Sequence, residues 1–156
     1  MSSLAVFAMA SCTNKKGDNQ SIENSDNTEI VSSNESQFVI TDIKNNDQFK
    51  IVDGLIISDN LPIVIDFNAK WCPPCQKFKP VFEEAAEKYA GQALFLSIDI
   101  DSYPEIAQTY KVESIPAIFF IQTGGGELGQ EVGYIDQTKL EGYINQLVAT
   151  AASNSQ

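Results

Sequence analysis

From residue 38 onward the chain alternates short apolar runs with longer amphipathic segments. Runs of β-branched and aromatic residues that are bounded by turn-forming residues predict strands. Strands are expected at 38–40, 63–67, 93–99, 115–121 and 131–134. The run at 63–67 lies between Pro62 and a turn, and its largely apolar character favours a buried parallel strand.

Helices are predicted where apolar residues recur at i, i+3, i+4 and i+7, because this spacing covers one face of a helix. The helix after the 63–67 strand has such a face in Phe78, Val81, Phe82, Ala85, Ala86 and Tyr89. Further helices are expected over 45–57, over 103–110 with Ser102 as its cap, and after Asp136. Strands and helices that alternate in this way predict an α/β fold around one sheet.

The polar segments at the two ends of the chain set the predicted domain boundaries. Residues 13–37 are almost entirely polar and cannot bury enough surface to become ordered, which predicts a disordered linker. Residues 38–150 form the folded domain, and 151–156 are expected to be a disordered tail. The chain has 156 residues, which is the size of one domain with a proper core.

Residues 1–12 read as a processing leader outside the fold. Their apolar run is too short to span a bilayer. The leader ends Ala10-Ser11-Cys12, and small residues directly before a cysteine resemble a bacterial lipoprotein signal. In that interpretation Cys12 is lipidated and tethers the protein to a membrane in the bacterial cell envelope or periplasm. The alternative is an unstructured N-terminus with an unpaired thiol, and a cytoplasmic protein.

Charge and composition exclude several classes of function. The net charge is −11, with ten lysines and no arginine, which argues against nucleic acid as a partner. The absence of histidine excludes Cys/His hydrolases, Ser/His/Asp triads and histidine metal sites. Three cysteines, one of them in the leader, are too few for a four-ligand zinc site. We therefore expect neither a metal nor a cofactor.

The segment Trp71-Cys72-Pro73-Pro74-Cys75 brings two thiols to the start of a predicted helix. Side chains at i and i+3 share a helix face, so the two sulfurs can reach disulfide distance. Cys72 lies at the positive end of the helix dipole, which favours its thiolate. Cys72 is therefore the expected nucleophile and Cys75 the resolving thiol of a disulfide exchange. Pro73 and Pro74 cannot donate an N–H to the Cys72 sulfur, which favours a more reducing couple.

Four features occur in order along the chain, namely Asp66 before the motif, Trp71-Cys72-Pro73-Pro74-Cys75 itself, Pro80 in the helix, and Ile115-Pro116. With these features the chain resembles the thioredoxin family from about Phe38 to Val148. The resemblance implies a thioredoxin fold, with a central mixed sheet of four or five strands flanked by helices, and disulfide oxidoreductase activity through the two cysteines. It also implies a cis bond before Pro116, beside the sulfurs, where that proline keeps metal away from them.

Asp66 is an acid inside an apolar strand, and burial should raise its pKa. It is therefore the expected proton acceptor for Cys75. In the family a lysine on the adjacent strand commonly accompanies this acid, but alignment leaves Ser97 at that position here. Lys70 is near Asp66 in sequence. The alternative interpretation is a polar group that water or the backbone satisfies.

An extended disulfide substrate is expected to lie on a platform next to the sulfurs. The predicted platform comprises Trp71, Pro73, Pro74, Ile115, Pro116 and Gly133. Trp71 could instead fill the core. Other aromatic residues within the strands are expected to be core, namely Phe67, Phe95, Phe119 and Phe120.

These observations predict a protein-disulfide reductase that acts on disulfide-containing client proteins and is recharged by an upstream thiol/disulfide electron donor. The turn lacks a histidine, a residue typical of strong oxidants, and this favours the reducing direction. Two alternatives stay open. One is an oxidase or isomerase of disulfides on the same fold. The other is a non-catalytic binding module or chaperone whose cysteines form a static disulfide.

Overall fold

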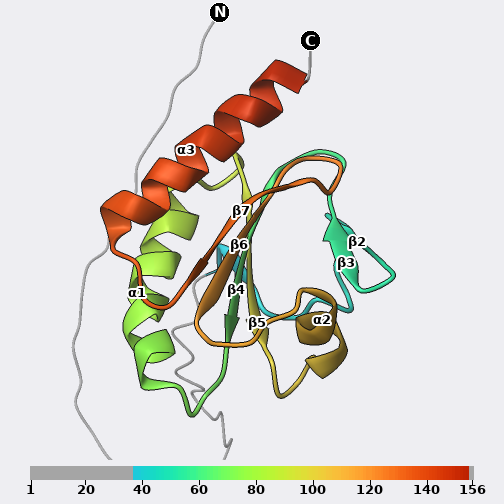
Figure 1. Ribbon diagram of the computed structural model, residues 1–156. Coiled ribbons are helices and arrows are strands. Elements are labelled where there is room, and N and C mark those ends of the chain that lie inside the picture. Colours follow the sequence, from blue (N-terminus) through green and yellow to red (C-terminus); the bar gives the residue numbers. More distant parts are fainter. Residues whose placement is uncertain (1–36, 155–156) are drawn as a thin grey trace, which may run out of the picture. The chain divides into compact units, whose positions relative to one another are not determined.

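The computed structural model describes residues 37–154. The predicted leader (1–12) and, apart from Gln37, the predicted linker (13–37) lie outside the described residues. No helix within 37–154 combines the length and the apolar character that crossing a bilayer requires. Along the described chain the elements are β1 Val39–Ile40, β2 Lys50–Val52, β3 Leu55–Ile57, β4 Ile63–Asn68, α1 Pro73–Lys88, β5 Leu94–Asp99, α2 Pro104–Thr109, β6 Ala117–Ile121, β7 Glu127–Val132 and α3 Gln137–Asn154 (Figure 1).

The main sheet has five strands in the order β1-β5-β4-β6-β7. Strands β1, β5 and β4 run parallel, whereas β6 pairs antiparallel with both β4 and β7. The expected mixed sheet of four or five strands flanked by helices is therefore confirmed. Strand β4 lies at its centre, and its carboxyl end leads directly into the turn that carries the two cysteines.

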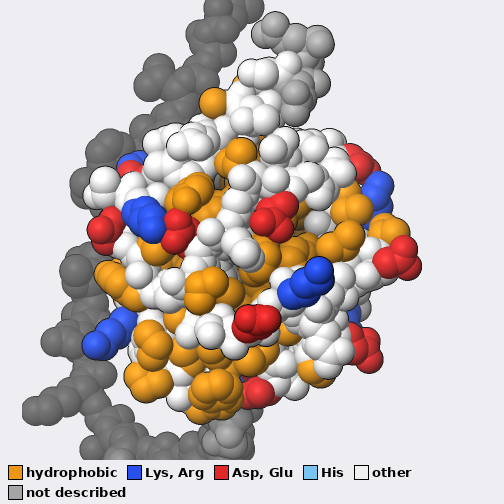
Figure 2. Space-filling view, viewed as in Figure 1, with side chains coloured by type: hydrophobic (Ala, Val, Ile, Leu, Met, Phe, Trp, Pro, Cys, Tyr) orange, Lys and Arg blue, Asp and Glu red, His pale blue; other side chains and the backbone are white. Residues whose placement is uncertain are grey.

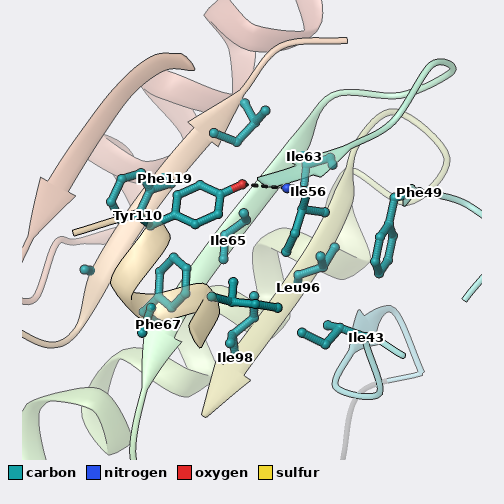
Figure 3. Packing of buried hydrophobic residues seen from close by; sticks show 14 of the residues in the cluster. Ile43, Phe49, Ile56, Ile63, Ile65, Phe67, Leu96, Ile98, Tyr110 and Phe119 are labelled. Carbon is teal, nitrogen blue, oxygen red and sulfur yellow. Dashed lines mark hydrogen bonds between the residues drawn. The ribbon is translucent and has the colours of Figure 1, made fainter. Parts of the chain in front are cut away.

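Helices α1 and α3 cover one face of the sheet, while α2 and the β2–β3 hairpin cover the other (Figure 1). Successive side chains of β4 alternate between these two layers, as the pleat of a strand requires. Ile63, Ile65 and Phe67 join the core beneath α2 and the hairpin (Figure 3). Val64 joins the core beneath α1 and α3. Asp66 is two residues from Val64 on the same strand, so its side chain points to the same face of the sheet, toward α1.

Three predictions are confirmed: the burial of the strand phenylalanines, the apolar face of α1 and the cap of the last helix. All four strand phenylalanines expected in the core are buried, with Phe67 and Phe119 on one side of the sheet and Phe95 and Phe120 on the other. The predicted apolar face of α1 packs in the core between the sheet and helices α1 and α3. Asp136 caps the last helix, because its carboxylate accepts a hydrogen bond of 2.8 Å from the Lys139 N–H.

The prediction of a helix over 45–57 is wrong, because residues 50–57 form the antiparallel hairpin β2–β3. Apolar residues at helical spacing suggested the helix, but Asp53 and Gly54 have φ of 52° and 81°. Two consecutive positive φ values fit the two-residue turn that matches the twist of a hairpin. Gly54 is also packed so closely that an added Cβ would collide with the Thr109 side chain. The hairpin thus depends on a glycine that a helix would not require.

A buried hydrogen bond attaches this hairpin to the rest of the domain. The Ile56 N–H donates to the Tyr110 hydroxyl at 3.0 Å, as the dashed line in Figure 3 shows. The Tyr110 ring packs against Phe67 and Phe119, with centroid distances of 5.3 and 5.2 Å. Tyr110, the residue after α2, therefore connects the β2–β3 hairpin to the central strands β4 and β6.

Other boundaries also differ from the sequence-based expectations. The strand expected over 115–121 begins at Ala117, so Ile115 and Pro116 precede β6. Tyr103 is the N-cap of α2, because the Ser102 hydroxyl donates to Asp99 instead of capping the helix. The last strand spans 127–132 and not 131–134, since the glycine at 133 has a φ of 89° and leaves the strand. Helix α3 continues through Asn154, so four of the six residues expected as a disordered tail are helical.

Candidate active site

Cys72 is the N-cap of helix α1, and Pro73 and Pro74 occupy the first two helical positions. Proline suits these positions because their N–H groups have no partner within a helix. The next N–H along the chain belongs to Cys75, and it donates to the Cys72 sulfur at 3.3 Å. The prolines thus leave the Cys72 sulfur with a donor from Cys75, a contact that the sequence argument did not include.

The two cysteines form a disulfide with a Cα–Cα distance of 5.3 Å. The expected proximity of the two sulfurs is therefore confirmed. The first turn of α1 carries no acidic residue, so nothing there opposes the positive end of the helix dipole. The site can therefore favour a thiolate at Cys72 after reduction of the disulfide.

Both cysteines are more covered in this oxidised form than an accessible nucleophile suggests. Cys72 is 3% exposed and Cys75 is 4% exposed. They pack against Ala69, Ile100 and Ile115 in a small apolar cluster. In the oxidised form both sulfur-bearing side chains are thus almost entirely covered.

The structure brings the predicted platform residues together around the sulfurs. The Ile115–Pro116 bond is cis, as the family resemblance implied. The Cys72 sulfur lies 3.8 Å from the Ile115 carbonyl oxygen. The Gly133 N–H donates to the Pro116 carbonyl oxygen at 2.7 Å, which ties the loop after β7 to the loop before β6.

Trp71 is 64% exposed, so its alternative interpretation as core filler is excluded. Its indole N–H donates to the Asp101 carboxylate at 2.8 Å, which fixes the ring beside the cysteine turn. Figure 2 shows hydrophobic side chains gathered at the lower end of this face, over the start of α1 and the loop after β4. Sequence reasoning missed Val132 and Tyr134, two more large exposed hydrophobic residues that flank Gly133.

Asp66 is 3% exposed and lies beneath α1. Burial raises the pKa of its carboxyl group to about 7, and a hydrogen bond from Asn68 opposes this rise. The Asn68 amide donates to Asp66 Oδ2 at 3.0 Å, whereas Asp66 Oδ1 has no hydrogen-bond partner among the described residues. The carboxyl group thus keeps one oxygen available for proton exchange.

A cavity of about 520 Å³ joins Asp66 to Cys75. Ser97 lies opposite Asp66 in the β4–β5 register, at the position where the sequence argument noted the missing lysine. Lys70 also lines the cavity, but the carboxyl group is hydrogen-bonded to the Asn68 amide instead. Sequence reasoning missed Asn68. The only signal for it was its spacing of two residues from Asp66, which puts both on one face of the strand.

Comparison with known proteins gives consistent matches. The profile of the Thioredoxin family matches residues 44–146. Thioredoxin H2-1 from Oryza sativa subsp. japonica is 42% identical over 93 residues, which cover 60% of this chain and 65% of that protein. Thioredoxin C-2 from Corynebacterium nephridii is 33% identical over 91 residues, which cover 58% of this chain and 83% of that protein. The chain thus spans just under two thirds of the rice relative's length.

Solved structures also match the described fold. The crystal structure of Deadhead, a germline-specific thioredoxin from Drosophila melanogaster, superposes with a TM-score of 0.53 at 35% sequence identity. The structure of Fasciola hepatica thioredoxin gives a TM-score of 0.53 at 32% identity. Each match covers 57% of this chain and 83% of the other.

Proposed function

This chain belongs to the thioredoxin family, and from this premise we propose that it is a thiol–disulfide oxidoreductase that reduces protein disulfides through Cys72 and Cys75. The observation that carries the proposal is the Cys72–Cys75 disulfide at the N-terminus of α1. Residues three apart at the start of a helix lie on the same face, so the bond between the two sulfurs can form and break within one turn. The surrounding exposed hydrophobic residues provide a surface for a protein substrate.

The proposed reaction begins with the reduced protein. The Cys72 thiolate attacks one sulfur of a substrate disulfide, forms a mixed disulfide and releases the other substrate sulfur as a thiolate, which takes up a proton. Cys75 then loses its proton and attacks the Cys72 sulfur. This second step releases the remaining substrate thiol and forms the Cys72–Cys75 disulfide. Two electrons pass to the substrate, and an upstream dithiol donor returns them to the protein.

Asp66 is the proposed acceptor of the Cys75 proton. Both side chains line the same cavity, and one oxygen of the carboxyl group has no partner among the described residues. A pKa of about 7 gives comparable amounts of acid and carboxylate near neutral pH. A general base with a pKa near the working pH is well suited to accept a proton and to return it later.

The substrate is proposed to lie as an extended segment across the rim of the cysteine turn. Trp71, Pro73 and Pro74 form one side of this rim, while Ile115, Pro116 and Gly133 form the other. The hydrogen bond between Gly133 and Pro116 and the contact of 3.8 Å between the Cys72 sulfur and the Ile115 carbonyl oxygen support this arrangement. Val132 and Tyr134 extend the hydrophobic surface beyond the residues that the sequence indicated.

The reducing direction is supported by the composition of the turn. A histidine between the cysteines would steady the thiolate and favour an oxidant, and the chain contains none. Pro73 and Pro74 have no N–H, so the Cys72 sulfur has fewer donors than a turn of other residues would give it. A less stabilised thiolate shifts the couple toward reduction of its substrate.

The function is tested by insulin reduction driven by dithiothreitol. The wild-type protein is expected to accelerate insulin precipitation, and Cys72→Ser is expected to abolish the acceleration, since the attacking sulfur is lost. Equilibration in graded glutathione buffers then measures the direction of exchange. A wild-type protein that gives no acceleration would leave only a binding module with a static disulfide. A potential as high as that of a strong oxidase would reverse the proposed direction.

We also propose that Cys12 is lipidated, so that the protein acts in the bacterial cell envelope while tethered to a membrane. The support is the sequence Ala10-Ser11-Cys12 after a short apolar run. Clients in that compartment are secreted proteins with disulfides. Wild-type protein is expected in the membrane fraction of a bacterial host, and Cys12→Ala in the soluble fraction. Membrane recovery that survives this substitution would exclude the lipid anchor, and wild-type protein in the soluble fraction would favour the alternative of a cytoplasmic location.

A further inference from the structure

Three polar side chains lie together on the face of the sheet that α1 covers. Asp66 and Asn68 share this face because they are two residues apart on β4. Ser97 joins them because it pairs with Asp66 across the β4–β5 ladder. Their neighbours on this face belong to an apolar core, where a polar side chain is retained only if it has a partner.

Asn68 links the other two residues. Its side-chain nitrogen lies 3.0 Å from Asp66 Oδ2, 3.2 Å from the Asp66 carbonyl oxygen and 2.8 Å from Ser97 Oγ. The Ser97 contact crosses the ladder diagonally, so it holds the amide in place from the neighbouring strand. The amide is therefore fixed from two sides while it donates to the carboxyl group.

We propose that Asn68 is the positioning residue of the Asp66 carboxyl group, with its amide held by Ser97 so that it occupies Oδ2 and leaves Oδ1 to exchange a proton with Cys75. This inference rests on the proposed oxidoreductase function. It gives Asn68 and Ser97 the place of the lysine that commonly accompanies this acid in the family.

An amide suits an acid that must exchange protons. Its NH₂ group donates to Oδ2 of the carboxylate, and Oδ2 still accepts this hydrogen bond, more weakly, when the proton is on Oδ1. A lysine ammonium carries a full positive charge, so it favours the carboxylate over the acid much more strongly. The Asn68 amide can therefore hold the carboxyl group in both of its protonation states, with Ser97 as the anchor on β5.

Other groups face the same cavity, but their described contacts leave Asn68 as the direct partner of the acid. Lys79 pairs with Glu83 on α1 at 3.8 Å, and Asp99 accepts from the Asp101 N–H and from Ser102. On the other side of Asp66, β6 contributes the apolar Ile118. The remaining titratable groups that line the cavity are Lys70, Cys75 and Tyr103.

The test compares Asn68→Ala and Ser97→Ala with the wild type in the full chain of 156 residues. A ¹³C NMR titration follows the Asp66 carboxyl carbon, and stopped-flow kinetics follow resolution of the mixed disulfide as a function of pH. Removing a hydrogen bond to the charged form should raise the Asp66 midpoint by about one pH unit in Asn68→Ala. Ser97→Ala, which loses only the anchor, should raise it by less.

Gln76→Ala is the matched control, because Gln76 also lines the cavity but its amide donates to the Lys70 carbonyl oxygen. It should leave the Asp66 midpoint unchanged. In an Asp66→Asn background, Asn68→Ala should no longer move the pH dependence of resolution, because the group through which it acts is absent. Thermal unfolding checks that each variant is folded, and Ser97→Ala provides a second variant if Asn68→Ala does not fold.

The two readouts separate the possible failures. An Asp66 midpoint that does not move in folded Asn68→Ala or Ser97→Ala would overturn the positioning role, whatever the protein's activity. A midpoint that rises while the pH dependence of resolution stays in place would show that Asp66 does not receive the Cys75 proton, and the inference would fall with that step. A parallel shift of both supports the proposal.

Discussion

Cys75→Ser is expected to trap the protein on its substrates as a stable mixed disulfide. Turnover in insulin reduction should fall by at least about a hundredfold, because serine cannot displace the substrate from the Cys72 sulfur. The first half of the reaction should still occur, since the attacking sulfur is unchanged. A covalent complex should therefore accumulate in proportion to the available substrate.

The positions of the two sulfurs explain why the trap forms at Cys72. Cys72 is the N-cap of α1, and its sulfur lies 3.8 Å from the Ile115 carbonyl oxygen. Cys75 lies three residues further along the chain, within the helix, and lines the cavity that contains Asp66. In the proposed mechanism the Cys72 sulfur therefore meets the substrate, and the Cys75 sulfur meets the proton acceptor.

Non-reducing gels and intact-mass spectrometry measure this complex after reaction with a disulfide-containing substrate. Cys72→Ser is the matched control. It should form no complex, because its remaining sulfur belongs to Cys75, the proposed resolving cysteine. A complex that formed equally well with Cys72→Ser would reverse the two roles. Absence of a complex with Cys75→Ser, despite normal folding, would argue against a mixed-disulfide intermediate.

Asp66→Asn is expected to stabilise the oxidised domain by up to about 4 kcal/mol at about pH 8. Burial raises the pKa of the Asp66 carboxyl group from 3.8 to about 7. Between these two values the folded protein binds a proton that the unfolded chain has released, so the free energy of unfolding falls as the pH rises. About three pKa units at roughly 1.4 kcal/mol each give this magnitude. Asparagine removes the buried charge and keeps the shape of the side chain.

Urea unfolding of both proteins across this pH range measures the difference. The advantage of Asp66→Asn should vanish toward about pH 4 and below, where the acid becomes protonated in the unfolded chain as well as in the folded one, and should be complete above about pH 7. Asp47→Asn, which changes an exposed carboxylate in the same domain, is the control and should leave stability unchanged. If the gain in the free energy of unfolding did not depend on pH, the stabilisation would come from packing and not from removal of the charge.

Most of the sheet could be predicted because its strands and its long helices have simple patterns. Strands β4, β5 and β6 are nearly continuous apolar runs, and α1 and α3 have one apolar face each. The β2–β3 hairpin was mistaken for a helix because four apolar residues fall at a helical spacing. The turn residues Asp53 and Gly54, between two short apolar runs, carried the correct signal, since this dipeptide is typical of two-residue hairpins.

The reactive part of the site could be predicted, whereas its supporting contacts could not. The two cysteines and Asp66 are recognisable from residue type and position, and the proline after Ile115 from the resemblance to the thioredoxin family. Asn68 resembles an ordinary polar residue at the end of a strand, and its contact with Ser97 spans 29 positions of sequence. Such a contact depends on the register between β4 and β5, which no local pattern determines.

The alternation along β4 restricts how the length of the domain can vary. One extra residue between Ile63 and Asp66 would turn the acid toward the hairpin side and away from Cys75, and it would exchange the side chains of the two cores as well. Length changes at this strand therefore destroy chemistry and packing together.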